Sequence, residues 1–309
     1  MIDVLNAVLP VFMLILLGYG LKHYAFITKS GWEGLERLTY YVFLPALLFH
    51  SFAGQPLANG HVLKTAVIII LLIFTAVALV AFFVGREVLR LENKTFASFF
   101  QGSIRFNNYI GLSLVAALFG TTGVNAYGVI VLVAIPLANF LTLAVMAHYA
   151  DERAFSLKRV TRQTVLNPLV LATIAGFIAS LIPIAFPMGK SLIGALASGA
   201  LPAGVLGIGA ALSLKNVKQA WKSVVGSCFV KLIVFPALIL VLMLFYDLPS
   251  PWWQVLMIFS VTPCATSCYI LSKHMNADAD AMASISAVTT LASALTMTLW
   301  MYGMMLWRG

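Results

Sequence analysis

Charged side chains are scarce in this sequence of 309 residues. Only 9% of the residues are Asp, Glu, Lys or Arg, whereas 61% are hydrophobic, and the mean hydropathy is +0.99. Soluble domains are about 25% charged and about 45–50% apolar, so the composition excludes a soluble globular protein. The net charge of +9 does not indicate a nucleic-acid partner, because the 19 Lys and Arg residues are scattered between apolar stretches.

Motifs for catalysis and metal binding are also absent. The three cysteines lie in apolar stretches, with no CxxC pair and no Cys/His cluster spaced for a metal. There is no GxxxxGK[ST] loop for ATP, no HExxH motif and no deep pair of carboxylates for hydrolysis. We therefore expect neither an enzyme nor a cofactor. Asp3 precedes the first apolar stretch without a basic flank, which predicts a retained span rather than a signal peptide.

Long apolar stretches fill most of the chain. A helix needs about 20 apolar residues to cross about 30 Å of hydrocarbon, and hydropathy windows of about 19 residues locate such stretches. They predict ten spans, near residues 4–26, 34–53, 62–85, 95–119, 124–149, 164–186, 189–212, 221–246, 252–273 and 279–306. The sequence therefore predicts an all-α integral membrane protein in contact with the lipid bilayer.

Basic residues are distributed unevenly among the predicted loops. About thirteen follow the odd-numbered spans, whereas the other loops and tails hold only Lys64, Lys190 and Arg308. Cytoplasmic loops collect Lys and Arg, so the odd-numbered loops are predicted to be cytoplasmic. We therefore expect a multi-pass protein of the cell inner membrane with both termini on the non-cytoplasmic side.

Short matches between the two halves of the chain share an offset of about 157 residues. The matching segments are Leu44-Pro45-Ala46 with Leu201-Pro202-Ala203, Pro10 with Pro168, and Phe106-Asn107-Asn108 with Pro263-Cys264-Ala265. They predict two five-span repeats, residues 1–155 and 156–309. Because five is an odd number, the second repeat crosses the membrane in the opposite sense, as in many secondary transporters.

A polar cluster interrupts the predicted span 95–119 near its middle. It contains Arg105, Asn107 and Asn108. Polar groups at this depth are tolerated only when they are buried in protein or line a wet cavity. We predict a helix break near Asn107, because Asn is a good N-cap and a half-helix after it would carry a partial positive charge at its start.

A second polar cluster interrupts the predicted span 252–273. Thr262 and Pro263 have the pattern of an N-cap followed by the first helical residue, and Thr266 and Ser267 come just after them. Two half-helix starts that meet near the membrane midplane would form an anion site. The alternative is a proline kink whose hydroxyl groups bond to carbonyls of the preceding turn.

Basic residues lie deeper in the predicted spans than acidic ones. All ten acidic residues fall in loops or near span ends, whereas Arg105 and Lys231 lie deep, at a cost of about 2.5–3.5 kcal/mol each. This distribution predicts an anionic substrate and argues against a carboxylate proton relay. Both residues have a structural alternative, in which Lys231 bonds to carbonyls or snorkels to an interface. Asn139, three residues after Pro136, either faces the same cavity or caps a kink.

Small residues recur every four positions in the predicted span 189–212. They are Gly199, Ala203, Gly207 and Ala211. This spacing is typical of membrane helices whose backbones approach closely. It predicts a packing face, either within the subunit or across a dimer.

Several short motifs together point to one transporter family. They are the segment from Arg105 to Gly111, Thr262-Pro263, Asn167-Pro168, the segment from Lys231 to Pro236, and Asp278-Ala279-Asp280. On these motifs, and over essentially the whole chain, the sequence resembles the auxin efflux carrier family. This family includes bacterial malonate and malate permeases and, more distantly, the plant PIN auxin carriers.

The resemblance implies an architecture and a role for one residue. It implies a scaffold of spans 1, 2, 6 and 7, a mobile transport domain of spans 3–5 and 8–10, crossed breaks in spans 4 and 9, an elevator-like motion and a homodimer. In the plant carriers, an Asn after a span-4 proline meets the substrate carboxylate. Asn107 matches that Asn, and Phe106 takes the place of the proline.

We therefore expect a secondary transporter of a small organic anion, a mono- or dicarboxylate such as malonate or malate, that works by alternating access. An anion channel and an exporter of an aromatic or hydrophobic weak acid are the alternatives. Coupling to protons or sodium is left open, with Asp278, Asp280 or a histidine as candidate groups. The candidate substrate-binding residues are Arg105, Asn107, Asn108, Asn139, Lys231, Thr262, Pro263, Thr266 and Ser267.

Overall fold

The computed structural model describes residues 2–53, 59–150, 158, 161–162, 165–181 and 187–308. These residues form helices and contain no strand, which confirms the all-α prediction. Six of the helical stretches are long and apolar enough to cross a membrane by their length and composition. They are Leu5–His23, Gly60–Val88, Asn93–Tyr149, Ser191–Ala211, Trp221–Met243 and Ala279–Met304.

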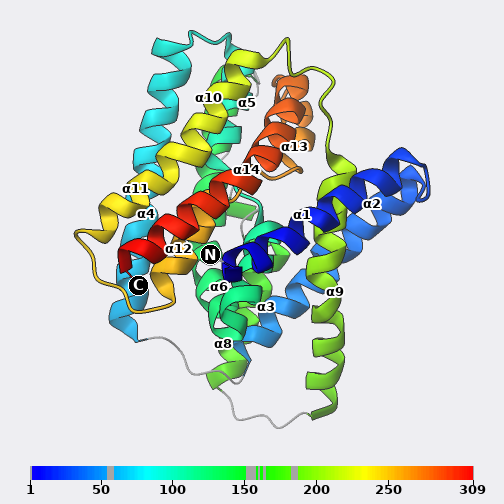
Figure 1. The fold of residues 1–309 in the computed structure, drawn as a ribbon, viewed down its shortest axis with the longest axis vertical. Coiled ribbons are helices and arrows are strands. Elements are labelled where there is room, and N and C mark those ends of the chain that lie inside the picture. Colours follow the sequence, from blue (N-terminus) through cyan, green and yellow to red (C-terminus); the bar gives the residue numbers. More distant parts are fainter. Residues whose placement is uncertain are drawn as a thin grey trace.

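The helices follow one another along the chain with several internal interruptions (Figure 1). In chain order they are α1 (Ile2–His23), α2 (Lys29–Leu38), α3 (Leu44–Phe52), α4 (Gly60–Phe83), α5 (Asn93–Ile104), α6 (Asn108–Tyr149), α8 (Pro168–Leu181), α9 (Pro187–Ala211), α10 (Trp221–Phe229), α11 (Phe235–Met243), α12 (Trp252–Val261), α13 (Cys268–His274) and α14 (Ala279–Arg308). Three π-helical segments continue or join them: η1 (Thr39–Phe43), η2 (Val84–Val88) and η3 (Val230–Val234). Within α6, Gly120 has φ 56° and ψ −144°, so the chain changes direction there, between the predicted spans 95–119 and 124–149.

Two groups of helices pack around α6 (Figure 1). In the first group, α9 packs on α1 and α3, and α3 also packs on α8. In the second group, α5 packs on α4, α10 and α14, and α12 packs on α11 and α14. Helix α6 contacts α1, α3, α8 and α9 on one side and α4, α5 and α12 on the other. This helix therefore joins the two groups.

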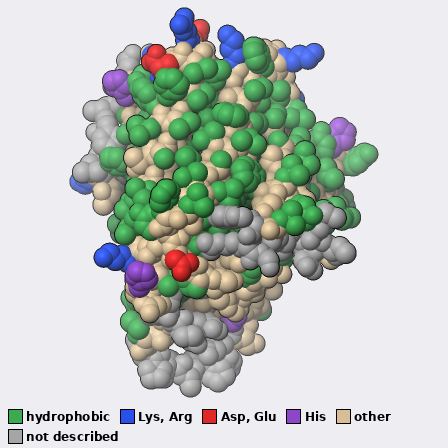
Figure 2. All heavy atoms as spheres, turned by 60° about the vertical axis from the view of Figure 1, so that its left-hand side comes forward, with side chains coloured by type: hydrophobic (Ala, Val, Ile, Leu, Met, Phe, Trp, Pro, Cys, Tyr) green, Lys and Arg blue, Asp and Glu red, His purple; other side chains and the backbone are tan. Residues whose placement is uncertain are grey.

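Hydrophobic side chains cover the outward face of α4, α10 and α11. Figure 2 shows this face as a broad apolar surface, with Lys and Arg side chains gathered at one end. Leu79, Phe83, Phe229 and Leu244 are more than half exposed there. An apolar band bordered by basic side chains is the surface that a lipid bilayer requires.

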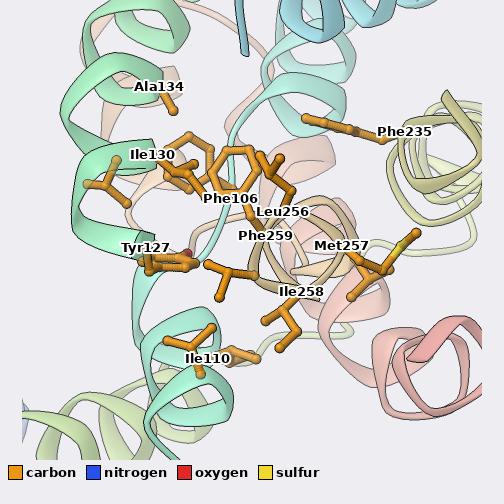
Figure 3. Packing of buried hydrophobic residues seen from close by; sticks show 14 of the residues in the cluster. Phe106, Ile110, Tyr127, Ile130, Ala134, Phe235, Leu256, Met257, Ile258 and Phe259 are labelled. Atoms are coloured by element: carbon orange, nitrogen blue, oxygen red, sulfur yellow. The ribbon is translucent and has the colours of Figure 1, made fainter. Parts of the chain in front are cut away.

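Aromatic rings fill the interior between α4, α12 and the start of α6. The Phe106 ring centroid lies 4.5 Å from that of Phe259 and 6.3 Å from that of Phe74, and Phe235 lies 6.0 Å from Phe259 (Figure 3). Phe74, Phe235 and Phe259 are fully buried. Such pairs contribute about 0.5–1.5 kcal/mol each beyond the burial of their area, so this cluster holds the middle of the protein together.

Glycines on α1 and α9 let the two helix backbones meet. A Cβ atom at Gly209 would lie 1.9 Å from the carbonyl oxygen of Ile15, and one at Gly18 would lie 2.1 Å from that of Leu206. The small-residue stripe does not make this contact: nothing lies within 4 Å of a Cβ atom at Gly207. The stripe was predicted to pack either within the subunit or across a dimer: Gly199 packs on Phe43 within the subunit, whereas Gly207 faces open space in it, and the dimer alternative stays a prediction.

We expect Gly209→Ala to destabilise the protein by about 1–3 kcal/mol, because backbone atoms of α1 cannot rotate away from the added methyl group. The matched control is Gly207→Ala, which adds the same methyl group to open space inside α9 and is expected to leave stability unchanged or raise it by up to about 1 kcal/mol through helix propensity. Thermal unfolding of both variants in detergent measures the difference. Equal unfolding temperatures for the two variants would show that α1 and α9 are not packed this closely.

Candidate substrate cavity

The first helix break lies between α5 and α6, where the sequence predicts it. Helix α5 ends at Ile104, and Arg105 is extended, with φ −75° and ψ 154°. Asn107 is the N-cap of α6: its Oδ1 accepts hydrogen bonds from the backbone N–H groups of Tyr109 at 3.0 Å and Ile110 at 3.2 Å. The predicted capping role of Asn107 is therefore confirmed, and its Nδ2 is the side-chain group left to donate to a ligand.

The second break lies between α12 and α13, but it is built differently from the prediction. The Thr262 hydroxyl donates to the carbonyl of Phe259 at 2.7 Å and so ends α12 rather than starting a new helix. Helix α13 begins only at Cys268, with Ser267 as its N-cap residue. The interpretation of Thr262-Pro263 as a helix start is wrong. The Thr262 hydroxyl bonds to the preceding turn because the Phe259 carbonyl is within its reach. The backbone N–H of Cys264 is not capped by Thr262 but donates to the Thr289 hydroxyl of α14, 3.4 Å away.

Polar side chains on α5 hold α13 in place. The Gln101 amide donates through Nε2 to the Cys268 carbonyl at 3.3 Å and accepts at Oε1 from the Ser272 hydroxyl at 2.9 Å.

Asp278, just before α14, accepts from Thr95 at 2.7 Å and from the N–H of Ala281 at 3.0 Å. The Oδ2 atom of Asp278 thus joins α5 to the start of α14 and the Oδ1 atom caps α14, which favours a structural role over ion coupling.

A cavity of about 510 Å³ lies beside the first break and is called the first cavity here. It brings together six of the nine predicted site residues, which are Arg105, Asn107, Asn108, Asn139, Thr266 and Ser267. Asn107 is 1% exposed and Asn139 is 8% exposed, so both are nearly enclosed by protein. The Oδ1 atom of Asn108 is buried and has no hydrogen-bond partner among the described residues. The three predicted carboxamides, all buried or half-buried, therefore line one small space.

Two helices start at the first cavity, and the second of them is not the one predicted. Asn167 lines the cavity, and its Oδ1 accepts from the N–H groups of Leu169 at 2.9 Å and Val170 at 3.4 Å, so it caps α8. Its Nδ2 donates to the Tyr40 hydroxyl at 3.2 Å. The starts of α6 and α8 thus both carry an Asn cap and a partial positive charge at this cavity. The Asn167-Pro168 pair has the sequence pattern of a helix start, so this site residue could have been found.

Three predicted site residues lie away from the first cavity. Thr262 and Pro263 are buried and are not among the residues that line it. Lys231 lies on η3, is fully buried, and its Nζ has no hydrogen-bond partner among the described residues. The Nζ atom is 4.1 Å from the centroid of the Phe235 ring, so its contact is with an aromatic face rather than with carbonyls or an interface.

Two acidic residues also line the first cavity, and they were not among the predicted site residues. Glu33 and Glu36 of α2 line it together with Arg37 and Arg105. Arg105 therefore shares the cavity with two acidic residues, which the sequence reasoning missed. The predicted span began at residue 34, whereas Glu33 and Glu36 lie on α2, an exposed helix that packs on α9.

A second cavity of about 730 Å³ adjoins the first, and both are lined by Glu33, Glu36, Tyr109, Thr266, Ser267 and Ile270. The Tyr109 ring occupies the space that a side chain at Gly204 of α9 would need, since a Cβ atom there would lie 2.0 Å from the ring. Ala203, Gly207 and Ala211 of the small-residue stripe line the second cavity. Small side chains on α9 therefore make room for this cavity and for Tyr109.

Comparison with known proteins agrees with this architecture. The membrane transport protein family matches residues 3–301. The chain belongs to this family. It is 24% identical over 316 residues to a protein of Rhizobium meliloti (strain 1021) named "Putative malonate transporter", covering 96% of this chain and 95% of that protein. It is also 20% identical over 295 residues to a protein of Methanothermobacter thermautotrophicus named "Uncharacterized transporter", covering 96% of each chain.

The family assignment confirms the resemblance to auxin efflux carriers and makes this chain a multi-pass membrane transporter rather than an enzyme. The two relatives are also named as transporters. A transporter needs a route for its substrate through the protein, and the two adjoining cavities are the candidates for that route.

Replacing Gln101 by Met is expected to destabilise the protein by about 1–3 kcal/mol, because the buried Cys268 carbonyl and the Ser272 hydroxyl lose their shared partner. Gln219→Met is the matched control, since Gln219 is exposed in the connection between α9 and α10. Unfolding in detergent, followed by circular dichroism, measures the stability of both variants. Stability equal to that of Gln219→Met would mean that α5 does not hold α13.

Proposed function

We propose that this protein is a secondary transporter of small organic anions, mono- or dicarboxylates such as malonate or malate. The observation that carries the proposal is the first cavity, which is lined by two Asn caps at helix starts, the Asn108 carboxamide and Arg105. Helix N-termini and guanidinium groups are the partners that carboxylates prefer. The malonate named for the Rhizobium meliloti relative fits this chemistry.

The transport cycle that we propose is an elevator-like alternating access. The chain is taken to cross the membrane ten times as two inverted five-span repeats, with both termini on the non-cytoplasmic side of the cell inner membrane. Spans 1, 2, 6 and 7 form the scaffold, and spans 3–5 and 8–10 form the moving domain. The packing of α9 on α1 and α3 and of α3 on α8, and of α5, α10 and α12 on α14 with α4 on α5, supports this division.

The location of the first cavity supports the same cycle. Arg105 and Asn107 belong to the proposed moving domain, whereas Asn167 and Tyr40 belong to the proposed scaffold. A ligand between the two domains would be released from the scaffold groups as the moving domain shifts. The homodimer implied by the family resemblance stays a prediction, as does the direction of net transport, which follows the gradients.

An affinity measurement tests the proposed site. We expect Asn107→Ala and Asn167→Ala each to weaken malonate binding by about tenfold or more, because each removes a donor to a charged ligand and a helix cap, and hydrogen bonds to charged groups contribute about 1.5–3 kcal/mol. The control is Asn6→Ala, since Asn6 is exposed on α1. Calorimetric titration in detergent gives the affinities, and circular dichroism verifies that each variant is folded.

Folded Asn107 and Asn167 variants with wild-type affinity would contradict the proposed site. A channel is the competing function, because the same cavity without alternating closure would conduct anions. Single-channel currents in planar bilayers, at rates far above the turnover of a carrier, would favour the channel. Accelerated exchange of external labelled malonate for internal malonate in proteoliposomes favours the carrier.

A further inference from the structure

Six residues line both cavities and mark the junction between them, which we call the neck. Helix α2 contributes Glu33 and Glu36, α6 contributes Tyr109, and the second break and α13 contribute Thr266, Ser267 and Ile270. A ligand that moves from one cavity to the other passes between these side chains, so the bulky ones among them limit its size.

The Tyr109 ring is the bulky side chain of the neck that packing holds in place. The ring lies so close to α9 that a Cβ atom at Gly204 would be 2.0 Å from its Cδ1 atom and 2.7 Å from its Cγ atom. The backbone N–H of Tyr109 donates to Oδ1 of Asn107 at 3.0 Å, which fixes the first turn of α6. The two glutamates of the neck are exposed and Ile270 is 50% exposed, so these side chains are free to change rotamer.

The ring can lie there only because position 204 has no side chain. A methyl group at Gly204 would have to displace the ring, because Cγ and Cδ1 are the ring atoms nearest their own backbone and cannot swing aside like the end of a long side chain. The α9 backbone blocks one side of the ring, and open space is found in the two cavities that Tyr109 lines. The fit between Tyr109 and Gly204 therefore sets how far the ring extends into the neck.

The second cavity extends from the neck to lysines near the ends of predicted spans. It is lined by Lys22, Lys29 and Lys215, which lie at or after the ends of the predicted spans 4–26 and 189–212. Because lysine collects in cytoplasmic loops, this is the predicted cytoplasmic side. A substrate that travels between the first cavity and that side would cross the neck.

We propose that Tyr109 is a specificity-determining residue of this carrier, and that its ring, seated against Gly204, admits slender dicarboxylates such as malonate through the neck and excludes those with a bulky substituent. This inference rests on the proposed anion transport and adds a size limit to it. The tyrosine ring is uncharged at neutral pH, so it discriminates between anions by their width rather than by their charge.

The test compares malonate with phenylmalonate, which has the same two carboxylates and a wider body. Proteoliposomes are loaded with labelled malonate, and release of the label is measured in exchange for either external acid. The wild-type protein is expected to exchange malonate about tenfold faster than phenylmalonate. Tyr109→Ala is expected to abolish this preference, because a wider neck admits the phenyl group. Tyr109→Phe, which keeps the ring, is expected to retain it.

A second comparison separates the neck from a general loss of folding. Gly204→Ala is expected to slow malonate exchange by about tenfold, because the displaced ring narrows the neck. The double variant Gly204→Ala with Tyr109→Ala is expected to recover the wild-type rate, since no ring remains to be displaced. The matched control is Gly207→Ala, which adds the same methyl group to the wall of the second cavity with nothing within 4 Å, and is expected to exchange malonate like the wild type. Circular dichroism verifies that each variant is folded.

Three results would overturn the role of Tyr109. They are equal rates for malonate and phenylmalonate in the wild type, a wild-type preference in folded Tyr109→Ala, and a folded double variant as slow as Gly204→Ala. Tyr109→Leu, which keeps an apolar contact with α9, replaces Tyr109→Ala if the latter does not fold. Absence of any protein-dependent malonate exchange in the wild type would instead refute the proposed function, and this inference with it.

Discussion

Every polar backbone group in the water-poor interior of a membrane protein needs a partner inside the protein, and this constraint governs the two helix breaks. At the first break, the Asn107 carboxamide accepts from two N–H groups that the start of α6 leaves free. At the second, the Thr262 hydroxyl and the Thr289 hydroxyl serve the end of α12 and the N–H of Cys264. The backbone can therefore leave the helical conformation at this depth only where these side chains supply the missing hydrogen bonds.

Packing joins the two breaks into one unit. Phe106 lies in the first break, and its ring contacts Phe259, whose carbonyl accepts the hydrogen bond from Thr262 at the edge of the second break (Figure 3). Gln101 then connects α5 to α13 through the Cys268 carbonyl and the Ser272 hydroxyl. A displacement of one break must carry the other with it, because interlocked rings and paired polar groups do not deform gradually. In the proposed cycle, the two breaks would therefore move together.

The first cavity has a balanced set of charges rather than a purely basic one. A cavity with only Arg105 and helix starts would hold an anion tightly and release it slowly. Two carboxylates on α2 would weaken this attraction, which would suit the proposed anion transport, in which the substrate must be released in each cycle. The fully buried Lys231, beside the Phe235 ring, contributes no direct contact to this balance.

The sequence alone determined the helical, membrane-embedded character of the chain, its family, the break at Asn107 and six of the residues around the first cavity. These features depend on composition and on local capping chemistry, which neighbouring residues decide. Only the tertiary structure decided that the Asn167-capped start of α8 lies at the same cavity as Asn107, that Thr262 ends α12, and that Glu33 and Glu36 line this cavity together with Arg105. These outcomes depend on which helices lie side by side, because a hydroxyl or a carboxylate takes whichever partner the packing brings within reach.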